Sequence, residues 1–205
     1  SWLRPVEISW APGRMMPLEP HSLLVAIAFA AACLTVVLFA VWLSARSSGF
    51  LLAWSVGALL VMANAALYGD YLAGGGRRAL AAAAAVLMIA LATLHGAAIQ
   101  FRSGRFPFGL AAGLAVGSVF LAVTPVLAGA DGLGLLAVNG LATAFLLAIA
   151  GTYWGMRAES RRLLTAVAGL YGLTAVSFVL CGILIVLDGQ FVLDRPPDNW
   201  AETLN

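Results

Sequence analysis

The sequence predicts an all-α integral membrane protein, a bundle of six transmembrane helices with short loops. Three observations support this fold class. Of the 205 residues, 62% are hydrophobic and only 10% are charged, whereas soluble domains carry about 25% charged residues. Residues 50–70 contain no charged side chain before Asp70, so they form a helix long enough to cross a bilayer. Trp54 and Tyr68 lie near the two ends of this segment, where amphipathic aromatic rings settle at membrane–water interfaces.

Apolar segments of about this length follow one another along the chain. We expect six spans at residues 22–44, 50–67, 79–100, 107–127, 133–154 and 163–187. Because the connections are short, neighbouring helices are expected to be antiparallel. The chain then divides into an irregular, proline-rich arm at residues 1–20, one membrane domain at 21–188 and an external tail at 189–205.

The arginine residues predict the orientation of the bundle. The connections after the first, third and fifth spans contain Arg46, Arg102, Arg105, Arg157, Arg161 and Arg162. The connections on the opposite side contain Arg77, Arg78 and the acidic Asp131. An excess of positive charge marks cytoplasmic loops. The first group is therefore predicted to form cytoplasmic anchors, with the N-terminus of the chain outside.

Small polar residues are predicted to gather in the outer half of the bundle. They are Asn64, Thr124, Asn139, Thr143, Thr174, Ser177 and Cys181. The favoured interpretation is inter-helix hydrogen bonding, with each contact worth about 0.6–2 kcal/mol. The alternative is a small ligand pocket that opens to the outside. In either case Asn64 and Asn139 should lie at similar depth and point inward, because hydrocarbon cannot satisfy an amide.

His95 is the only ionisable side chain deep within an expected span, in the inner third of the third helix. An intramembrane ionisable group is a functional candidate. The favoured interpretation is a neutral histidine bonded to a neighbouring helix, and the alternative is a sensing role. Haem ligation would need a second axial ligand, and the other histidine, His21, is expected near the opposite face of the membrane.

The fourth span carries Gly109, Gly113 and Gly117 at four-residue spacing, so the three glycines share one helix face. Such a face lets another backbone come close. Packing inside the bundle is the favoured interpretation, and a dimer interface is the alternative. A leucine at Gly113 is accordingly expected to disrupt a helix contact.

No catalytic pattern is recognisable in the sequence. It contains no nucleophile–base set, carboxylate pair, metal-ligand cluster or phosphate-binding glycine loop. No cofactor or metal is therefore expected, and the chain alone is not expected to be an enzyme. The net charge of +2 and the scattered arginines do not indicate nucleic-acid binding.

Residues 15–63 resemble the N-terminal membrane region of bacterial diguanylate cyclases of the GGDEF family. The shared pattern is a short leader and first span, a basic turn at Arg46, and a second span that opens with apolar residues 51–53, Trp54 and Gly57. Residues 94–108, with the sequence LHGAAIQFRSGRFPF, are similar to the end of the third span in that family. They share its basic turn and following proline.

The resemblance implies a sensory or regulatory region in a bacterial cytoplasmic (inner) membrane, which would control paired cyclase domains that make cyclic di-GMP. No GGDEF segment is present, so none of the family's catalytic residues has a counterpart here. A cytoplasmic cyclase domain would require one more span after Asn205.

Two other functions fit the composition. The chain can be an accessory subunit that binds laterally to a larger membrane complex and stabilises it. A small transporter is a weaker alternative, because charged pathway residues and inverted repeats are not recognisable. The expected partners are membrane lipid and either a second copy of the chain or a larger membrane complex. The reading frame beyond Asn205 distinguishes the sensory interpretation from the accessory one.

Overall fold

The computed structural model describes residues 20–44, 46, 48–156, 158 and 160–187, with the backbone alone described at 20–24. These residues form helices and contain no strand, which confirms the all-α prediction for this part of the chain. The helices are α1 (Pro20–Ser44), α2 (Gly49–Asp70), a short turn η1 (Tyr71–Gly75), α3 (Gly76–Ser103), α4 (Phe108–Leu127), α5 (Asp131–Gly155) and α6 (Arg161–Leu187). Their ends differ from the expected spans by at most three residues. Residues 1–19 of the expected arm and all of the expected tail lie outside the described residues.

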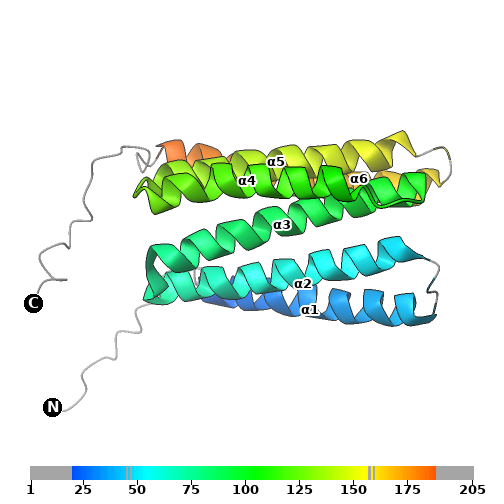
Figure 1. Cartoon of the computed structure of the whole chain (residues 1–205), viewed down its shortest axis with the longest axis horizontal. Coiled ribbons are helices and arrows are strands. Elements are labelled where there is room, and N and C mark those ends of the chain that lie inside the picture. The colour runs from blue at the N-terminus through cyan, green and yellow to red at the C-terminus, as the bar shows by residue number, and fades with distance from the viewer. Residues whose placement is uncertain (1–19, 45, 47, 157, 159, 188–205) are drawn as a thin grey trace, which may run out of the picture.

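Helices α2 and α3 are joined by η1, a single π-helical turn, without an extended loop. The backbone φ angle is 101° at Gly74 and 71° at Gly76, in a region that residues with a Cβ atom rarely adopt. The chain reverses direction at these glycines. Helices α2 and α3 therefore pack side by side as an antiparallel pair (Figure 1).

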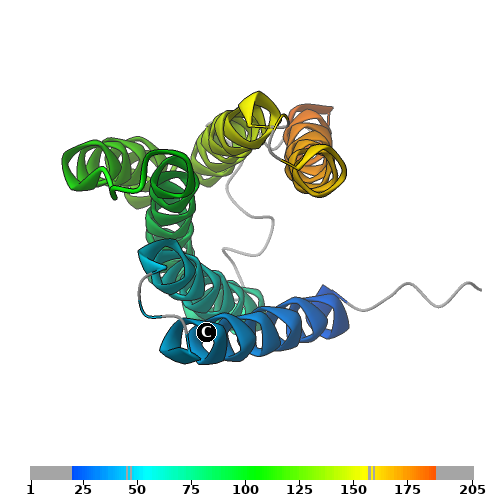
Figure 2. The same cartoon turned by 90° about the vertical axis from the view of Figure 1, so that its right-hand side faces the viewer.

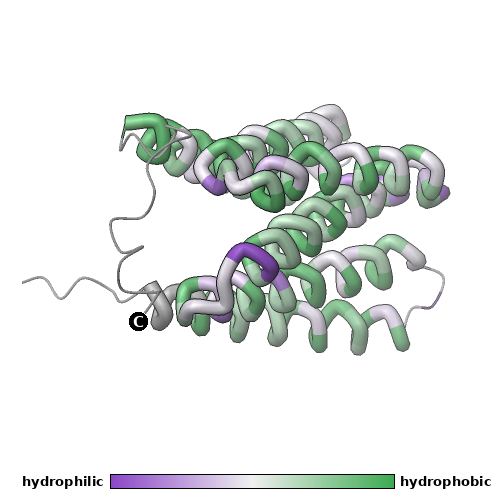
Figure 3. Tube along the Cα trace, turned by 60° about the vertical axis from the view of Figure 1, so that its left-hand side comes forward, coloured by the Kyte–Doolittle hydropathy of each residue, from purple (hydrophilic) through white to green (hydrophobic). Residues whose placement is uncertain are grey.

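Five helical stretches of the described chain are long and apolar enough to cross a membrane: Val25–Ser44, Gly49–Ser103, Phe108–Leu127, Asp131–Gly155 and Arg161–Leu187. The second has 55 residues because it includes α2, η1 and α3. Apolar residues cover most of the helices, and hydrophilic residues gather toward the helix ends (Figure 3). Large apolar side chains such as Phe29 and Phe108 are 70% and 76% exposed. Such a surface fits a multi-pass membrane protein, because lipid solvates it.

Helix α3 is the centre of the architecture. It packs against α2, α4 and α5, and α5 packs in turn against α4 and α6. Among the described helices, α1 packs only on α2 and α6 packs only on α5. Seen along the helices, the chain forms an open arc, with α1 near one end and α6 near the other (Figure 2). The outer helices therefore use one side for packing inside the chain and present the rest to the surroundings.

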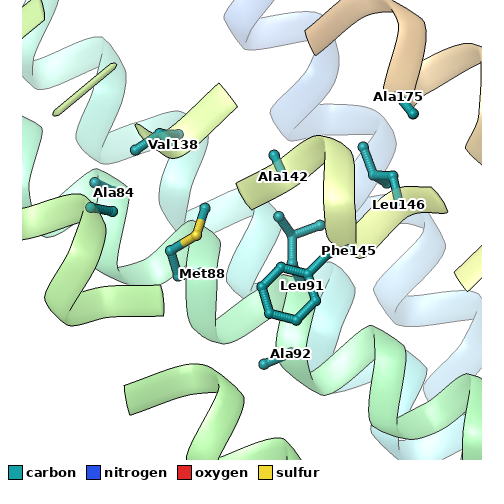
Figure 4. Close-up of a cluster of buried hydrophobic side chains, with 10 residues drawn as sticks. Ala84, Met88, Leu91, Ala92, Val138, Ala142, Phe145, Leu146 and Ala175 are labelled. Atoms are coloured by element: carbon teal, nitrogen blue, oxygen red, sulfur yellow. The ribbon is translucent and has the colours of Figure 1, made fainter. Parts of the chain in front are cut away.

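Small residues let α3 lie close to its three neighbours. Its alanine-rich sequence includes Ala83, Ala90 and Ala97, each at most 1% exposed. The main core cluster combines Met88 and Leu91 of α3 with residues of α4, α5 and α6. Figure 4 shows Phe145 of α5 lying against Leu91. This packing determines which face of α3 is buried and which residues lie at the boundary with α4.

Candidate functional site

Asn64 makes an inter-helix hydrogen bond of the kind the sequence predicts. Its side-chain nitrogen donates to the backbone oxygen of Ala83, at 2.9 Å, and so connects α2 to α3. On the same face of α2, Gly57 lies two turns away and is buried. A Cβ atom at Gly57 would overlap the side chain of Leu94. This part of the α2–α3 interface is therefore closed, and its polar group is satisfied within the chain.

Asn139 and Thr143 lie in a groove of about 430 Å³ between α5 and α6. The side chain of Asn139 donates to the oxygen of Leu135 at 2.7 Å, and the hydroxyl of Thr143 donates to the oxygen of Asn139 at 2.8 Å. Both bonds stay within α5 instead of connecting two helices. The groove is otherwise lined by apolar residues such as Phe178 and Ile183.

The other residues of the predicted outer cluster do not converge on this groove. Thr124, Ser177 and Cys181 are exposed on the sides of α4 and α6. The hydroxyls of Thr174 and Ser177 donate to the oxygens of Leu170 and Leu173, one turn back in α6. The prediction of inter-helix hydrogen bonds is therefore wrong for Asn139, Thr143, Thr174 and Ser177. Hydrogen bonds to the preceding helical turn satisfy small hydroxyls without any tertiary partner, so the membrane does not force these residues inward.

The three glycines of α4 also lie differently from the favoured prediction. A Cβ atom at Gly109, Gly113 or Gly117 would meet no other atom within 4 Å. The glycine face is thus open and packs against no other described helix. The reason is that α4 approaches α3 and α5 through other residues, including the buried Ala122. The prediction of close packing inside the bundle is wrong.

His95 lines a groove of about 400 Å³ where α3, α4 and α5 meet. Gly113 and Gly117 form part of the α4 wall, and Phe145 contributes from α5 with its ring centroid 6.3 Å from the imidazole. His95 lies eight residues from the end of α3, which corresponds to a depth of about 12 Å.

The imidazole of His95 makes no hydrogen bond to any residue that the structure describes, and its Nδ1 atom is buried without a partner. The hydrogen bond expected from His95 to a neighbouring helix is therefore not formed. The nearby Ser118 hydroxyl donates to the oxygen of Leu114 at 2.6 Å, one turn back in its own helix. Among the polar side chains that line this groove, His95 is consequently the one whose hydrogen-bonding capacity is unused.

Tyr153 does not stand out in the sequence, yet it is the centre of an aromatic cluster. It is 2% exposed, and its ring centroid lies 6.0 Å from that of Trp54, 6.1 Å from that of Phe101 and 6.0 Å from that of Tyr171. Its hydroxyl is buried without a described partner. The indole nitrogen of Trp54 is likewise buried without a hydrogen-bond partner among the described residues. The four-residue spacing of Phe145, Ile149 and Tyr153 would have placed Tyr153 on the core face of α5.

The predicted arginine groups lie at opposite ends of the bundle. One end of the bundle holds the connections with Arg46 and Arg105 and the adjoining helix ends with Arg102, Arg161 and Arg162. The Gly74–Gly76 turn and the connection from α4 to α5 lie at the other end (Figure 1). Arg157 lies outside the described residues. At the second end, the Nε of Arg77 donates to Asp131 at 3.2 Å in a partly exposed salt bridge. Such exposed pairs contribute about 0–1 kcal/mol to stability.

Within the described residues, no group of three or more His, Cys, Asp or Glu side chains is placed to hold a metal ion. The His95 groove combines open space with an imidazole that has no hydrogen-bond partner among the described residues, so it is the candidate functional site. We treat it as a binding site built from one imidazole and mainly apolar walls. Comparison with known proteins found no matching family model, curated protein or solved structure.

Proposed function

We propose that this chain is the membrane-embedded sensory or regulatory region of a protein like the GGDEF-family diguanylate cyclases, without catalytic activity of its own. The observation that carries the proposal is the packing of the two segments that resemble that family. Phe50 of α2 contacts Phe101 of α3, with ring centroids 4.9 Å apart. Gly57 of the first segment lies against Leu94 of the second.

This contact gives the shared residues a common physical role. Gly57 has no Cβ atom, which lets α2 approach the Leu94 side chain of α3. Trp54 extends the contact to Tyr153 of α5. The resembling residues thus join three helices at the end of the bundle that carries the Arg46 and Arg102 connections. A change in the packing of these helices would alter the helix positions at that end directly. That is the end from which an output domain would be controlled.

We infer that the chain crosses the membrane six times. The 55 residues of Gly49–Ser103 would form a continuous helix of roughly 80 Å, far beyond the hydrocarbon thickness of about 30 Å. The reversal at Gly74 and Gly76 supports two spans in this stretch. The excess of arginines supports a cytoplasmic position for the Arg46, Arg102 and Arg161 connections, in a bacterial inner membrane with the N-terminus outside.

Cysteine labelling in intact cells tests this orientation. In a chain without Cys33 and Cys181, a cysteine introduced beside Asp131 should react with a membrane-impermeant reagent added from outside. A cysteine at Ser103 should react only after the membrane is opened. The reverse pattern would contradict the orientation.

The reading frame after Asn205 tests the sensory function. We expect one further span followed by a GGDEF domain, and the full protein should then produce cyclic di-GMP in cells that lack other cyclases. A stop codon or an unrelated domain at this place would contradict the proposal.

A stop codon would favour the second candidate function, an accessory subunit that binds laterally to a larger membrane complex. The observation that supports it is the open glycine face of Gly109, Gly113 and Gly117 on α4. A face of this kind lets a helix of another subunit approach closely.

A further inference from the structure

We propose that the groove between α3, α4 and α5 binds a lipid-soluble molecule that presents a carbonyl or carboxylate oxygen to the imidazole of His95. The role of this groove as the input site of a sensory region rests on the function proposed above. Binding itself can be measured on the chain alone. Four features of the groove determine the chemistry of the occupant.

The first feature is the unused hydrogen-bonding capacity of His95. Its Nδ1 atom is buried and has no partner. A buried N–H without an acceptor is costly, so we assign the proton of the neutral ring to Nε2. Nε2 is not among the buried unpartnered atoms and has no hydrogen bond to a described residue, so it is the accessible ring nitrogen. Because His95 lines the groove, we assign the Nε2–H as the group that meets the occupant. The ring therefore offers one N–H donor.

The second feature is that the rest of the groove offers no competing donor among the described side chains. The Ser118 hydroxyl is directed to the carbonyl oxygen of Leu114. The other walls are glycine and apolar residues, including Leu141 and Phe145. A hydrogen-bond acceptor on an otherwise apolar molecule matches this arrangement.

The third feature is the size of the groove. Its volume of about 400 Å³ falls in the range of about 300–1,000 Å³ that is typical of small-molecule sites. The missing side chains of Gly113 and Gly117 keep the α4 wall open, since a Cβ atom at either position would meet nothing within 4 Å. Larger residues at these two positions would fill the space that the occupant uses.

The fourth feature is access from the lipid. Leu121, which lines the groove, is 57% exposed, and Val116 and Phe120 on the same helix are 71% and 66% exposed. These side chains face the surroundings of a membrane-spanning helix. A molecule that reaches His95 therefore arrives from the bilayer and must be soluble in it.

The test uses the ring nitrogens of His95 as the reporter. The chain has two histidines, so ¹⁵N-histidine labelling of a His21→Gln variant in lipid nanodiscs leaves one imidazole signal. The probes are decylubiquinone, which offers ring carbonyls, and lauric acid, which offers a carboxyl group. Dodecane is the apolar control. We expect one oxygen-bearing probe to shift the His95 ¹⁵N resonances in a saturable way, and dodecane to leave them unchanged.

Matched variants locate the binding. Gly113→Leu and Gly117→Leu should lower the apparent affinity at least about tenfold, or about 1.4 kcal/mol. Gly109→Leu is the control, because Gly109 lies on the same open face but does not line the groove. Ala144→Leu fills the groove from α5 and replaces the α4 variants if these do not fold.

Three results would overturn the proposal: no shift with either oxygen-bearing probe, an equal shift with dodecane, or an equal loss of binding in Gly109→Leu. The last result would assign the whole glycine face to a helix contact. Because this assay needs no output domain, its failure leaves the sensory function to be judged by the reading frame and by cyclic di-GMP production.

Discussion

The α2–α3 interface and the α3–α4–α5 groove contain the same kinds of residue but use them in opposite ways. In the interface, Gly57 lies directly against Leu94, and the amide of Asn64 is bonded to Ala83 of the neighbouring helix. In the groove, a Cβ atom at Gly113 would meet nothing within 4 Å, and the imidazole of His95 has no hydrogen bond to a described residue. One region is complete within the chain, and the other has both space and an unused polar group.

The difference shows which features of a membrane helix indicate a binding site. A glycine or a polar side chain alone does not, because both occur in the closed α2–α3 interface. The groove of Asn139 makes the same point, since its volume of about 430 Å³ is similar but its amide is satisfied by Leu135 of the same helix. Space combined with an unsatisfied polar group is what sets the His95 groove apart.

The largest expected effect separates the two kinds of glycine. Gly57→Leu should destabilise the protein by about 1–3 kcal/mol or more, because the new side chain overlaps Leu94. Gly113→Leu should change stability by no more than about 0.5 kcal/mol, because the added atoms enter open space. Thermal unfolding of both variants in the same detergent measures the contrast. Equal destabilisation would show that the α4 glycine face is packed after all.

A smaller effect separates the two asparagines. Asn64→Ala removes the hydrogen bond between α2 and α3 and should cost about 0.6–2 kcal/mol. Asn139→Ala removes a bond within α5 and should cost less. Reversible unfolding in mixed micelles gives both free energies. If Asn139→Ala proved the more costly of the two, its amide would have a tertiary role that the described contacts lack.

The smallest effect concerns His95. Replacing it by phenylalanine removes a buried nitrogen that has no partner, so stability should stay within about 0.5 kcal/mol of the parent or rise slightly. The same unfolding assay measures the change. His95→Tyr serves as a control, because tyrosine has the same six-membered ring as phenylalanine but adds a polar hydroxyl. A loss above about 1 kcal/mol would indicate a hydrogen bond from His95 within the folded chain.

Much of the fold could be predicted because hydropathy acts locally. A run of apolar residues must satisfy its own backbone in lipid, and a helix is the way to do so. The helix ends therefore follow from charged, aromatic and glycine residues along the chain, and the observed ends lie within three residues of the expected ones. The inter-helix role of Asn64 also follows, because its amide has no acceptor on the lipid side.

The rotation of each helix about its own axis was decided by the tertiary structure alone. Helix α4 turns its glycine face outward, and α6 exposes Ser177 and Cys181. Lipid and protein interior are about equally apolar, so hydropathy does not tell which face of such a helix is buried. Close packing against the small residues of α3 and α5 selects the faces instead. That choice left His95 without a partner beside open space, which the sequence alone does not reveal.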